Sequence, residues 1–225
     1  MILEGVKHFT EKEDERRDKI LMDYFGEEGI ERITKTITDC LLSPPKLKSD
    51  AKILDVGAGS GLFTVRVFER VRNSLPEASF YAMDVTPAML MILRRKTGEV
   101  TPFLGIAENI TGSAQYASKY MEAPDRFDAI FSTLTLHHCP DIAEVFRSIK
   151  EALEGHGKAV LIDLCEHPFK EFRVEMGDLH LGFNPSIIKE EAEKFFTKVN
   201  VKEIPELSCE CSNRAAHLFV AYLIP

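Results

Sequence analysis

Three glycines and an aspartate stand close together in a short stretch that could bind a ligand. The stretch reads ILDVGAGSGLFT from residue 53 to residue 64, and it contains Asp55, Gly57, Gly59 and Gly61. Glycine permits positive φ and lets the backbone approach a ligand without a Cβ in the way. The dinucleotide fingerprint G-x-G-x-x-G would need its third glycine at position 62, where leucine stands. Because the Asp55 carboxylate would repel a pyrophosphate and suits a cation, the turn predicts a ligand without phosphate.

Two further acidic residues follow the next two apolar runs. Asp84 comes about twenty residues beyond the glycines, where a carboxylate typically accepts hydrogen bonds from ribose hydroxyls. Its alternative role is to cap a helix, for which Thr86 is the better candidate. Glu108 follows the third run, as an acceptor for an exocyclic amine or as a solvated loop residue. The three acids suit a ligand that carries a cationic sulfonium, an amino group, a ribose and an adenine.

Short apolar runs alternate with helical stretches from residue 51 onward, and these elements must position the acids. Strands are predicted at residues 52–56, 79–84, 101–106, 129–133, 158–164, 199–204 and 217–223. Helices are predicted at residues 62–74, 87–96, 112–121, 142–154 and 186–196. This order predicts a doubly wound α/β fold with a mostly parallel sheet, which binds ligands at the carboxyl ends of its strands. The last two strands, with only residues 205–214 between them, should pair antiparallel.

The N-terminal 45 residues form a charged segment with its own pattern. Apolar residues from Phe9 to Leu42 recur near helical spacing, with Gly26 between two helices, and prolines 44 and 45 end the second helix. We expect residues 1–45 to form a helical cap over residues 46–225, the ligand-binding part of one compact unit.

The composition disfavours some partners and compartments. The chain has 225 residues, with 28 Lys and Arg against 36 Asp and Glu, so its formal charge of −8 makes nucleic acid an unfavourable partner. It contains neither a signal-peptide pattern nor an apolar run of membrane-spanning length, so a soluble, cytoplasmic protein is expected. Five cysteines without regular spacing predict reduced thiols. The pattern leaves open whether the protein is a monomer or a homodimer.

Residues 52–164 resemble the class I S-adenosylmethionine (SAM) dependent methyltransferases. The resemblance rests on ILDVGAGSG at residues 53–61, on Asp84, and on FDAIFS at residues 127–132 leading into LHHCPD at residues 136–141. It implies SAM as the cofactor and S-adenosylhomocysteine as the product. It also implies a Rossmann-like, seven-stranded sheet that is mostly parallel with its last strand antiparallel.

The same resemblance assigns roles to individual residues. It implies that the three glycines surround the methionine part of SAM, that Asp55 lies near its amino group, and that Asp84 holds the ribose hydroxyls. The other implied cofactor-binding residues are Ala58 in the glycine turn, Val85 and Met89 on the adenine, Ala107 and Glu108 at its edge, and Thr133 and Leu134 on the methionyl side.

The acceptor side is expected near the ends of the fourth and fifth strands and in the irregular segment that follows. His137, His138 and His180 are candidate catalytic residues there, although a structural role for the paired histidines is equally expected. The segment MGDLHLGF at residues 176–183 resembles the substrate-pocket region of ubiquinone- and menaquinone-type C-methyltransferases. We therefore expect a small organic acceptor, methylated by in-line displacement, with a general base required only if the acceptor must lose a proton.

Alternative functions remain open. The chain could be a SAM-binding sensor or scaffold without turnover, or a methyltransferase of protein, RNA or a metalloid held by cysteines 139, 165, 209 and 211. The missing N/D-P-P-Y/F sequence after the fourth strand disfavours amino methylation of adenine or glutamine, and Leu62 disfavours a nicotinamide oxidoreductase. No metal site is expected, because the sequence has no C-x-x-C pair.

Overall fold

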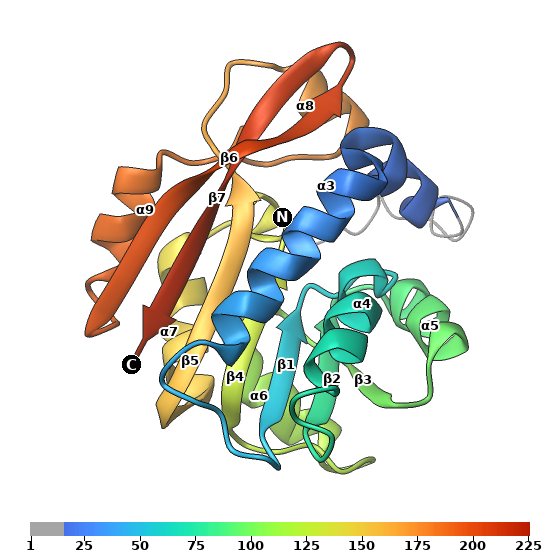
Figure 1. Cartoon of the computed structure of the whole chain (residues 1–225), viewed down its shortest axis with the longest axis vertical. Helices are drawn as coiled ribbons and strands as arrows, with labels where there is room; N and C mark the ends of the chain where they lie inside the picture. The colour runs from blue at the N-terminus through green and yellow to red at the C-terminus, as the bar shows by residue number, and fades with distance from the viewer. Residues whose placement is uncertain (1–15) are drawn as a thin grey trace.

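A seven-stranded sheet runs through the protein, whose computed structural model describes residues 16–225 (Figure 1). Its order is β3-β2-β1-β4-β5-β7-β6. The strands are β1 (Lys52–Val56), β2 (Ser79–Asp84), β3 (Val100–Leu104), β4 (Phe127–Thr133), β5 (Leu153–Leu164), β6 (Lys198–Cys211) and β7 (Arg214–Ile224). The first five pair in parallel, whereas β7 is antiparallel to both β5 and β6. The predicted doubly wound sheet with an antiparallel last strand is confirmed.

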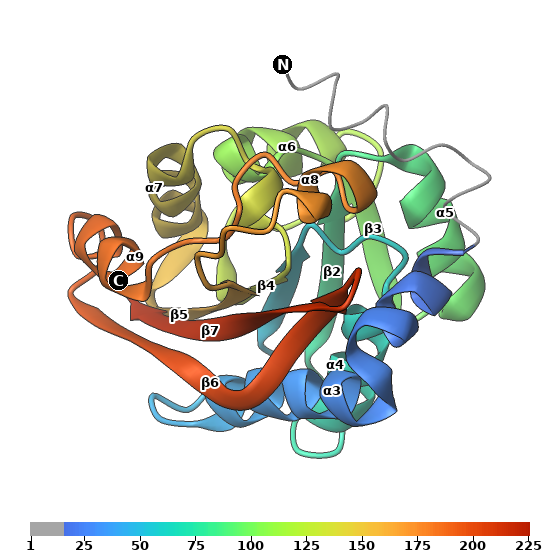
Figure 2. The ribbon, with the colours of Figure 1, turned by 90° about the horizontal axis from the view of Figure 1, so that it is seen from above.

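Helices cover both faces of this sheet (Figure 2). On one face lie α3 (Arg17–Leu42), α4 (Leu62–Val71) and α5 (Pro87–Lys96), and on the other lie α6 (Ile110–Ala117), α7 (Ile142–Ala152) and α9 (Pro185–Ala192). Three short helices, η1 (Ala107–Asn109), η2 (Leu136–His138) and α8 (Glu171–Glu175), follow β3, β4 and β5. Between residues 16 and 225, no helix has the length and apolar character needed to span a membrane.

The N-terminal helix α3 packs against α4, β5 and β6. On each side of Gly26 its buried apolar residues recur every three or four positions, which puts them on one face: Leu21 and Phe25 before it, and Ile30, Ile33, Ile37 and Leu41 after it. Two helices separated by Gly26 were predicted here, and α3 does consist of two helical segments joined by a kink at Gly26, whose φ of 63° and ψ of 170° leave the helical path. Phe9, part of the same prediction, lies outside the described residues.

The last two strands form a long hairpin, which differs from the predicted connection at residues 205–214. Strand β6 continues to Cys211, and only Ser212 and Asn213, both at positive φ, separate it from β7. The proline at position 205 predicts the end of a strand because it lacks an amide donor. In the structure the pairing with β7 is interrupted by a register irregularity between Ile204 and Ser208 and then continues. Cys209 and Cys211, placed in that connection by the sequence analysis, are therefore buried strand residues.

Truncation of Ile33 tests the docking of α3 on the sheet. The side chain is 0% exposed, so Ile33→Ala should lower the free energy of unfolding in urea by about 2–5 kcal/mol. The matched control is Lys35→Ala, which removes an exposed side chain paired with Asp39 and should change that free energy by ~0.5 kcal/mol or less. Equal effects of the two substitutions would show that α3 is not docked in this way.

Candidate functional site

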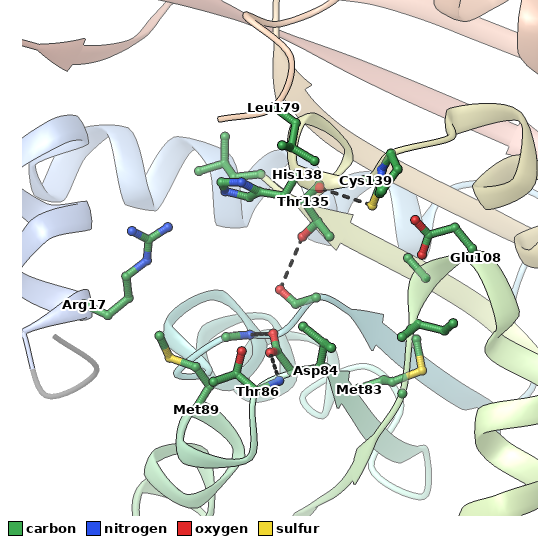
Figure 3. Close-up of a pocket in the computed structure, with 18 residues that line it drawn as sticks. Arg17, Met83, Asp84, Thr86, Met89, Glu108, Thr135, His138, Cys139 and Leu179 are labelled. Atoms are coloured by element: carbon green, nitrogen blue, oxygen red, sulfur yellow. Dashed lines mark hydrogen bonds between the residues drawn. The ribbon is translucent and has the colours of Figure 1, made fainter. Parts of the chain in front are cut away.

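Two adjoining cavities lie at the carboxyl ends of the parallel strands. The wide cavity extends from the glycine turn past Asp84 and η1 to Leu179, and Figure 3 shows the side chains around it. The narrow cavity lies deeper, between Asp55, Ser60, Phe63 and Thr133. Gly57 and Gly59 line both cavities, so one ligand can extend from one cavity into the other.

The glycine turn connects β1 to α4 and forms the floor of both cavities. The backbone amides of Gly57 and Ala58 donate to the carbonyl oxygen of Met83 at 2.8 and 3.0 Å, which fixes the turn against β2. Gly57 has φ of 74°, and a Cβ there would collide with the Thr135 side chain. Substitution of this glycine is therefore excluded both by backbone conformation and by space.

Asp55 brings a buried carboxylate to the narrow cavity. Its side chain is 2% exposed, and Thr64 Oγ1 donates to its Oδ2 at 2.6 Å. The second oxygen, Oδ1, is buried and has no hydrogen-bond partner among the described residues. Burial raises the pKa of Asp55 to about 7, and the hydrogen bond from Thr64 opposes that shift. A carboxylate with one unsatisfied buried oxygen is suited to an ammonium group.

Asp84 ends β2 and faces the wide cavity. Its Oδ2 accepts from the amide of Gly59 and its Oδ1 from the amide of Thr86, both at 2.8 Å. Thr86 is the N-cap of α5, but its own side chain makes no capping bond, so the aspartate orders this turn instead. Burial raises the pKa of Asp84, and the two backbone donors oppose the shift. Both oxygens retain lone pairs that can accept from a ligand.

Most of the predicted cofactor residues meet around the two cavities. Those lining the wide cavity are Gly57, Gly59, Asp84, Val85, Met89, Ala107, Glu108 and Leu134, and those lining the narrow cavity are Asp55, Gly57, Ala58, Gly59, Thr133 and Leu134. Gly61 lines neither. It has φ of 81°, starts α4, and sits so close to Leu93 that a Cβ would collide. Because it has no side chain, Gly61 allows the turn to pack closely against Leu93 of α5.

Arg17 was missed by the sequence analysis, although it lines both cavities. It starts α3 and enters the wide cavity from that helix, while Glu108 enters from beyond β3 (Figure 3). Burial lowers the pKa of Arg17, and the neighbouring Tyr24, Asp178 and Asp84 oppose that shift. Nothing distinguishes this arginine from the other charged residues of an amphipathic helix in sequence, because only tertiary docking brings it to the site.

The paired histidines differ in environment. His137, 1% exposed, has its Nδ1 2.6 Å from Asp163 Oδ1, and its Nε2 lies 3.5 Å from Asp178 Oδ1. Burial alone would lower the pKa of His137, but Asp163 and Asp178 outweigh it and raise that pKa. Burial raises the pKa of Asp178 to about 6, opposed by His137. His138 is less buried and lines the wide cavity.

The segment before α9 forms the other side of the wide cavity. The amides of Leu179 and His180 donate to the carbonyl oxygen of His137 at 3.1 and 3.0 Å. His180 Nε2 donates to the carbonyl oxygen of Cys139 at 3.0 Å, so its ring ties this segment to the loop after β4. Among the three histidines, His138 is the one whose side chain borders the wide cavity directly. A catalytic role for any of them stays a prediction.

The cysteines do not form a thiolate site. All four of the cysteines considered for a metalloid are buried free thiols. Burial raises the pKa of Cys211 and of Cys165 to about 12, and it also raises that of Cys209. Among the described residues, no group of three or more potential ligands that includes a cysteine lies close enough together to hold an ion, so the geometry gives the metalloid alternative no support.

Comparisons with known proteins agree with this geometry. Residues 53–157 match the family model described as a methyltransferase domain. Malonyl-[acyl-carrier protein] O-methyltransferase 1 of Ilyobacter polytropus is 24% identical over 144 residues, which are 63% of this chain and 49% of that protein. Highly reducing polyketide synthase PKS6 of Gibberella zeae is 24% identical over 169 residues, which are 74% of this chain and 6% of that protein. The chain thus spans less than half the length of these curated relatives.

A solved structure shows the same fold. Phosphoethanolamine N-methyltransferase 2 of Haemonchus contortus, solved in complex with S-adenosyl-L-methionine, superposes with a TM-score of 0.68 at 15% identity, covering 96% of this chain and 57% of that one. The fold is therefore that of the class I methyltransferases. In sequence, residues 53–157 thus match a methyltransferase domain, within a fold that this SAM-bound enzyme shares.

The buried Asp55 carboxylate predicts a pH-dependent stability. The folded pKa of about 7 lies above the ordinary 3.8, so Asp55 contributes stability that is fully present below pH 3.8 and is lost as pH rises through 7. Asp55→Asn has no charge to bury. In cofactor-free protein, its stability relative to the wild type should therefore rise by about 1.4 kcal/mol per pH unit across that window.

Urea unfolding at a series of pH values measures this difference. Asp50→Asn, an exposed residue just before β1, is the matched control and should show no such trend. A difference between Asp55→Asn and the wild type that stays constant from pH 4 to pH 7.5 would contradict the burial of an uncompensated charge.

Proposed function

We propose that the protein transfers the methyl group of SAM to a small-molecule acceptor. The observation that carries the proposal is the unsatisfied Oδ1 of Asp55 beside the glycine turn, because an amino acid ammonium is the group that this oxygen suits. The methionine part of SAM would lie in the narrow cavity, with Gly57, Gly59 and Thr133 around it. Asp84 would accept from the ribose hydroxyls, and Val85, Met89, Ala107 and Glu108 would surround the adenine.

Arg17 extends this assignment to the carboxylate of SAM. Among the described residues that line the two cavities, it is the one with a permanent positive charge. It lies on the cap segment, so binding of SAM would tie α3 to the glycine turn. We infer that residues 1–45 act as a cap that helps to close the cofactor site over residues 46–225.

The acceptor would bind between the loop after β4 and Leu179. This part of the wide cavity is bordered by His138, Cys139, Pro140 and Leu179, a mixed polar and apolar surface. Residues 176–183 resemble the pocket region of ubiquinone- and menaquinone-type C-methyltransferases, and the position of Leu179 at the cavity supports this assignment. The relatives are named for phosphoethanolamine and for malonyl-[acyl-carrier protein], one free and one carrier-bound small group. These names support a small acceptor group but leave carbon, nitrogen and oxygen open as the methylated atom.

The chemistry that SAM supplies is a methyl group on a sulfonium. The acceptor's lone pair forms the new bond to the methyl carbon as the carbon–sulfur bond breaks, and its electrons remain on sulfur in S-adenosylhomocysteine. The chain's own residues hold the two molecules in line and exclude water. Alignment of this kind lowers a barrier by up to roughly 7–11 kcal/mol, so no fixed general base is required when the acceptor is already nucleophilic.

Arg17→Gln tests the carboxylate contact. The substitution should weaken binding of S-adenosylhomocysteine by about 10-fold or more, because a hydrogen bond to a charged group is worth about 1.5–3 kcal/mol. Isothermal titration measures the change. Arg16→Gln, the exposed neighbour outside both cavities, is the matched control and should bind as the wild type does. Equal binding by the two variants would remove Arg17 from the cofactor site.

A labelled-methyl screen tests the function itself. The protein is incubated with methyl-labelled SAM and, separately, with a small-metabolite extract, a protein extract and RNA. Label in the small-metabolite fraction is expected. The Asp84→Asn variant should not produce this label, because the substitution weakens the hydrogen bonds that the carboxylate would accept from the ribose hydroxyls of SAM. Asp128→Asn alters another aspartate, which accepts from the Lys52 amide at the opposite edge of the sheet, and it should retain transfer.

The outcomes separate the alternatives. Label in protein or RNA alone would replace the small acceptor by a macromolecule. Binding of SAM without transfer to any fraction would favour a sensor or scaffold. Absence of SAM binding in the wild type would overturn the cofactor assignment as well.

A further inference from the structure

A second cluster of potential ligands lies beside the wide cavity and is not used by the assignment above. It consists of His137 and His138 on η2 and Asp178 in the segment between α8 and α9. One ligand atom from each lies within 4.8 Å of the other two. The imidazole rings are 4.1 Å apart, and His137 Nε2 is 3.5 Å from Asp178 Oδ1. A zinc ion with bonds of about 2.0–2.2 Å holds its ligand atoms roughly 3–4 Å apart, so small side-chain rotations suffice.

The cluster is buried and electrostatically incomplete. His137 is 1% and Asp178 is 4% exposed. Among the described residues, His137 Nε2 and both carboxylate oxygens of Asp178 lack a hydrogen-bond partner. Buried polar atoms without partners are costly and uncommon in folded proteins. Two such side chains aimed at the same point indicate that a ligand belongs between them.

Asp163 sets the orientation of His137. Its Oδ1 lies 2.6 Å from His137 Nδ1 and also accepts from the amide of Leu164 at 2.7 Å. When Nδ1 carries the proton and donates it to Asp163, Nε2 presents a lone pair to the carboxylate of Asp178. A lone pair facing a carboxylate is repulsive, so a positive charge belongs between them: either a proton on Nε2, which pairs with Asp178 at 3.5 Å, or a metal ion that replaces this proton. A carboxylate behind a ligating histidine is the usual arrangement at metal sites.

We propose that His137, His138 and Asp178 bind one divalent transition-metal ion of the Zn²⁺ type, with Asp163 as the positioning residue behind His137. Two imidazoles and a carboxylate suit such an ion better than Mg²⁺, which takes oxygen ligands. The charges of Asp178 and Asp163 balance those of the ion. No metal was expected from the sequence because it contains no C-x-x-C pair, and the cluster found here combines two adjacent histidines with an aspartate about forty residues further along the chain.

Three protein ligands leave a coordination position for another molecule. His138 also lines the wide cavity, so the ion would stand at the border of the space assigned to the acceptor. An oxygen or nitrogen of the acceptor can take the open position there. This last step rests on the proposed methyl transfer, whereas metal binding itself does not.

Metal titration of the full chain tests the proposal. Chelator-treated protein is titrated with Zn²⁺ by calorimetry and with Co²⁺ by absorption spectroscopy, in the absence of SAM and acceptor. The wild type should bind one equivalent, with a Co²⁺ spectrum of nitrogen and oxygen ligands. Asp178→Asn and His138→Gln should weaken binding by well over 10-fold, and Asp163→Asn by about 10–100-fold.

The controls separate this site from others. His156→Gln removes a half-exposed histidine that is bonded to Asp128, and it should leave the affinity unchanged. Circular dichroism establishes that each variant is folded, and His138→Gln serves if a variant of a more buried residue is not. Failure to bind one equivalent overturns the proposal, and so does an affinity that Asp178→Asn and His138→Gln leave unchanged. A thiolate-to-cobalt charge-transfer band would assign the metal to cysteines instead.

Discussion

The parallel pairing of β1 between β2 and β4 is the constraint on which the site depends. Parallel strands end at the same edge, so residues distant in sequence are brought together without any contact between their own helices. Asp55 and Asp84 reach one end of that edge, and His137 and Asp163 reach the other. The proposed cofactor half and the proposed acceptor half of the site are therefore two parts of one sheet edge.

The cofactor half is fixed by backbone as much as by side chains. Amides of the glycine turn donate to the carbonyl of Met83, and the amide of Gly59 donates to Asp84. These bonds order the turn in the absence of a ligand, so the turn loses less conformational entropy when a ligand binds. The buried charge of Asp55 acts in the opposite sense. It destabilises the free protein at neutral pH and becomes favourable only when a cation is present.

The parts of the fold and the site that could be predicted from the sequence are those that depend on residues close together along the chain. Each of the acids Asp55, Asp84 and Glu108 lies in or just after an apolar run, so their positions near strand ends could be predicted. Arg17 and Asp178 could not, because they reach the site through docking of α3 and of an irregular segment. The end of β6 was predicted too early, at the proline of position 205, because proline usually interrupts strand pairing. In the structure β6 pairs with β7 on both sides of this proline.

The segment around Leu179, which is proposed to border the acceptor, is attached to η2 through main-chain atoms. The amides of Leu179 and His180 both donate to the carbonyl oxygen of His137, so this segment follows η2 whatever side chain stands at position 179. Leu179 is 41% exposed and borders the wide cavity. Evolution can therefore exchange that side chain, and with it the shape offered to the acceptor, while the scaffold beneath remains in register. Divergence of substrate range within such a family needs little more than this kind of local replacement.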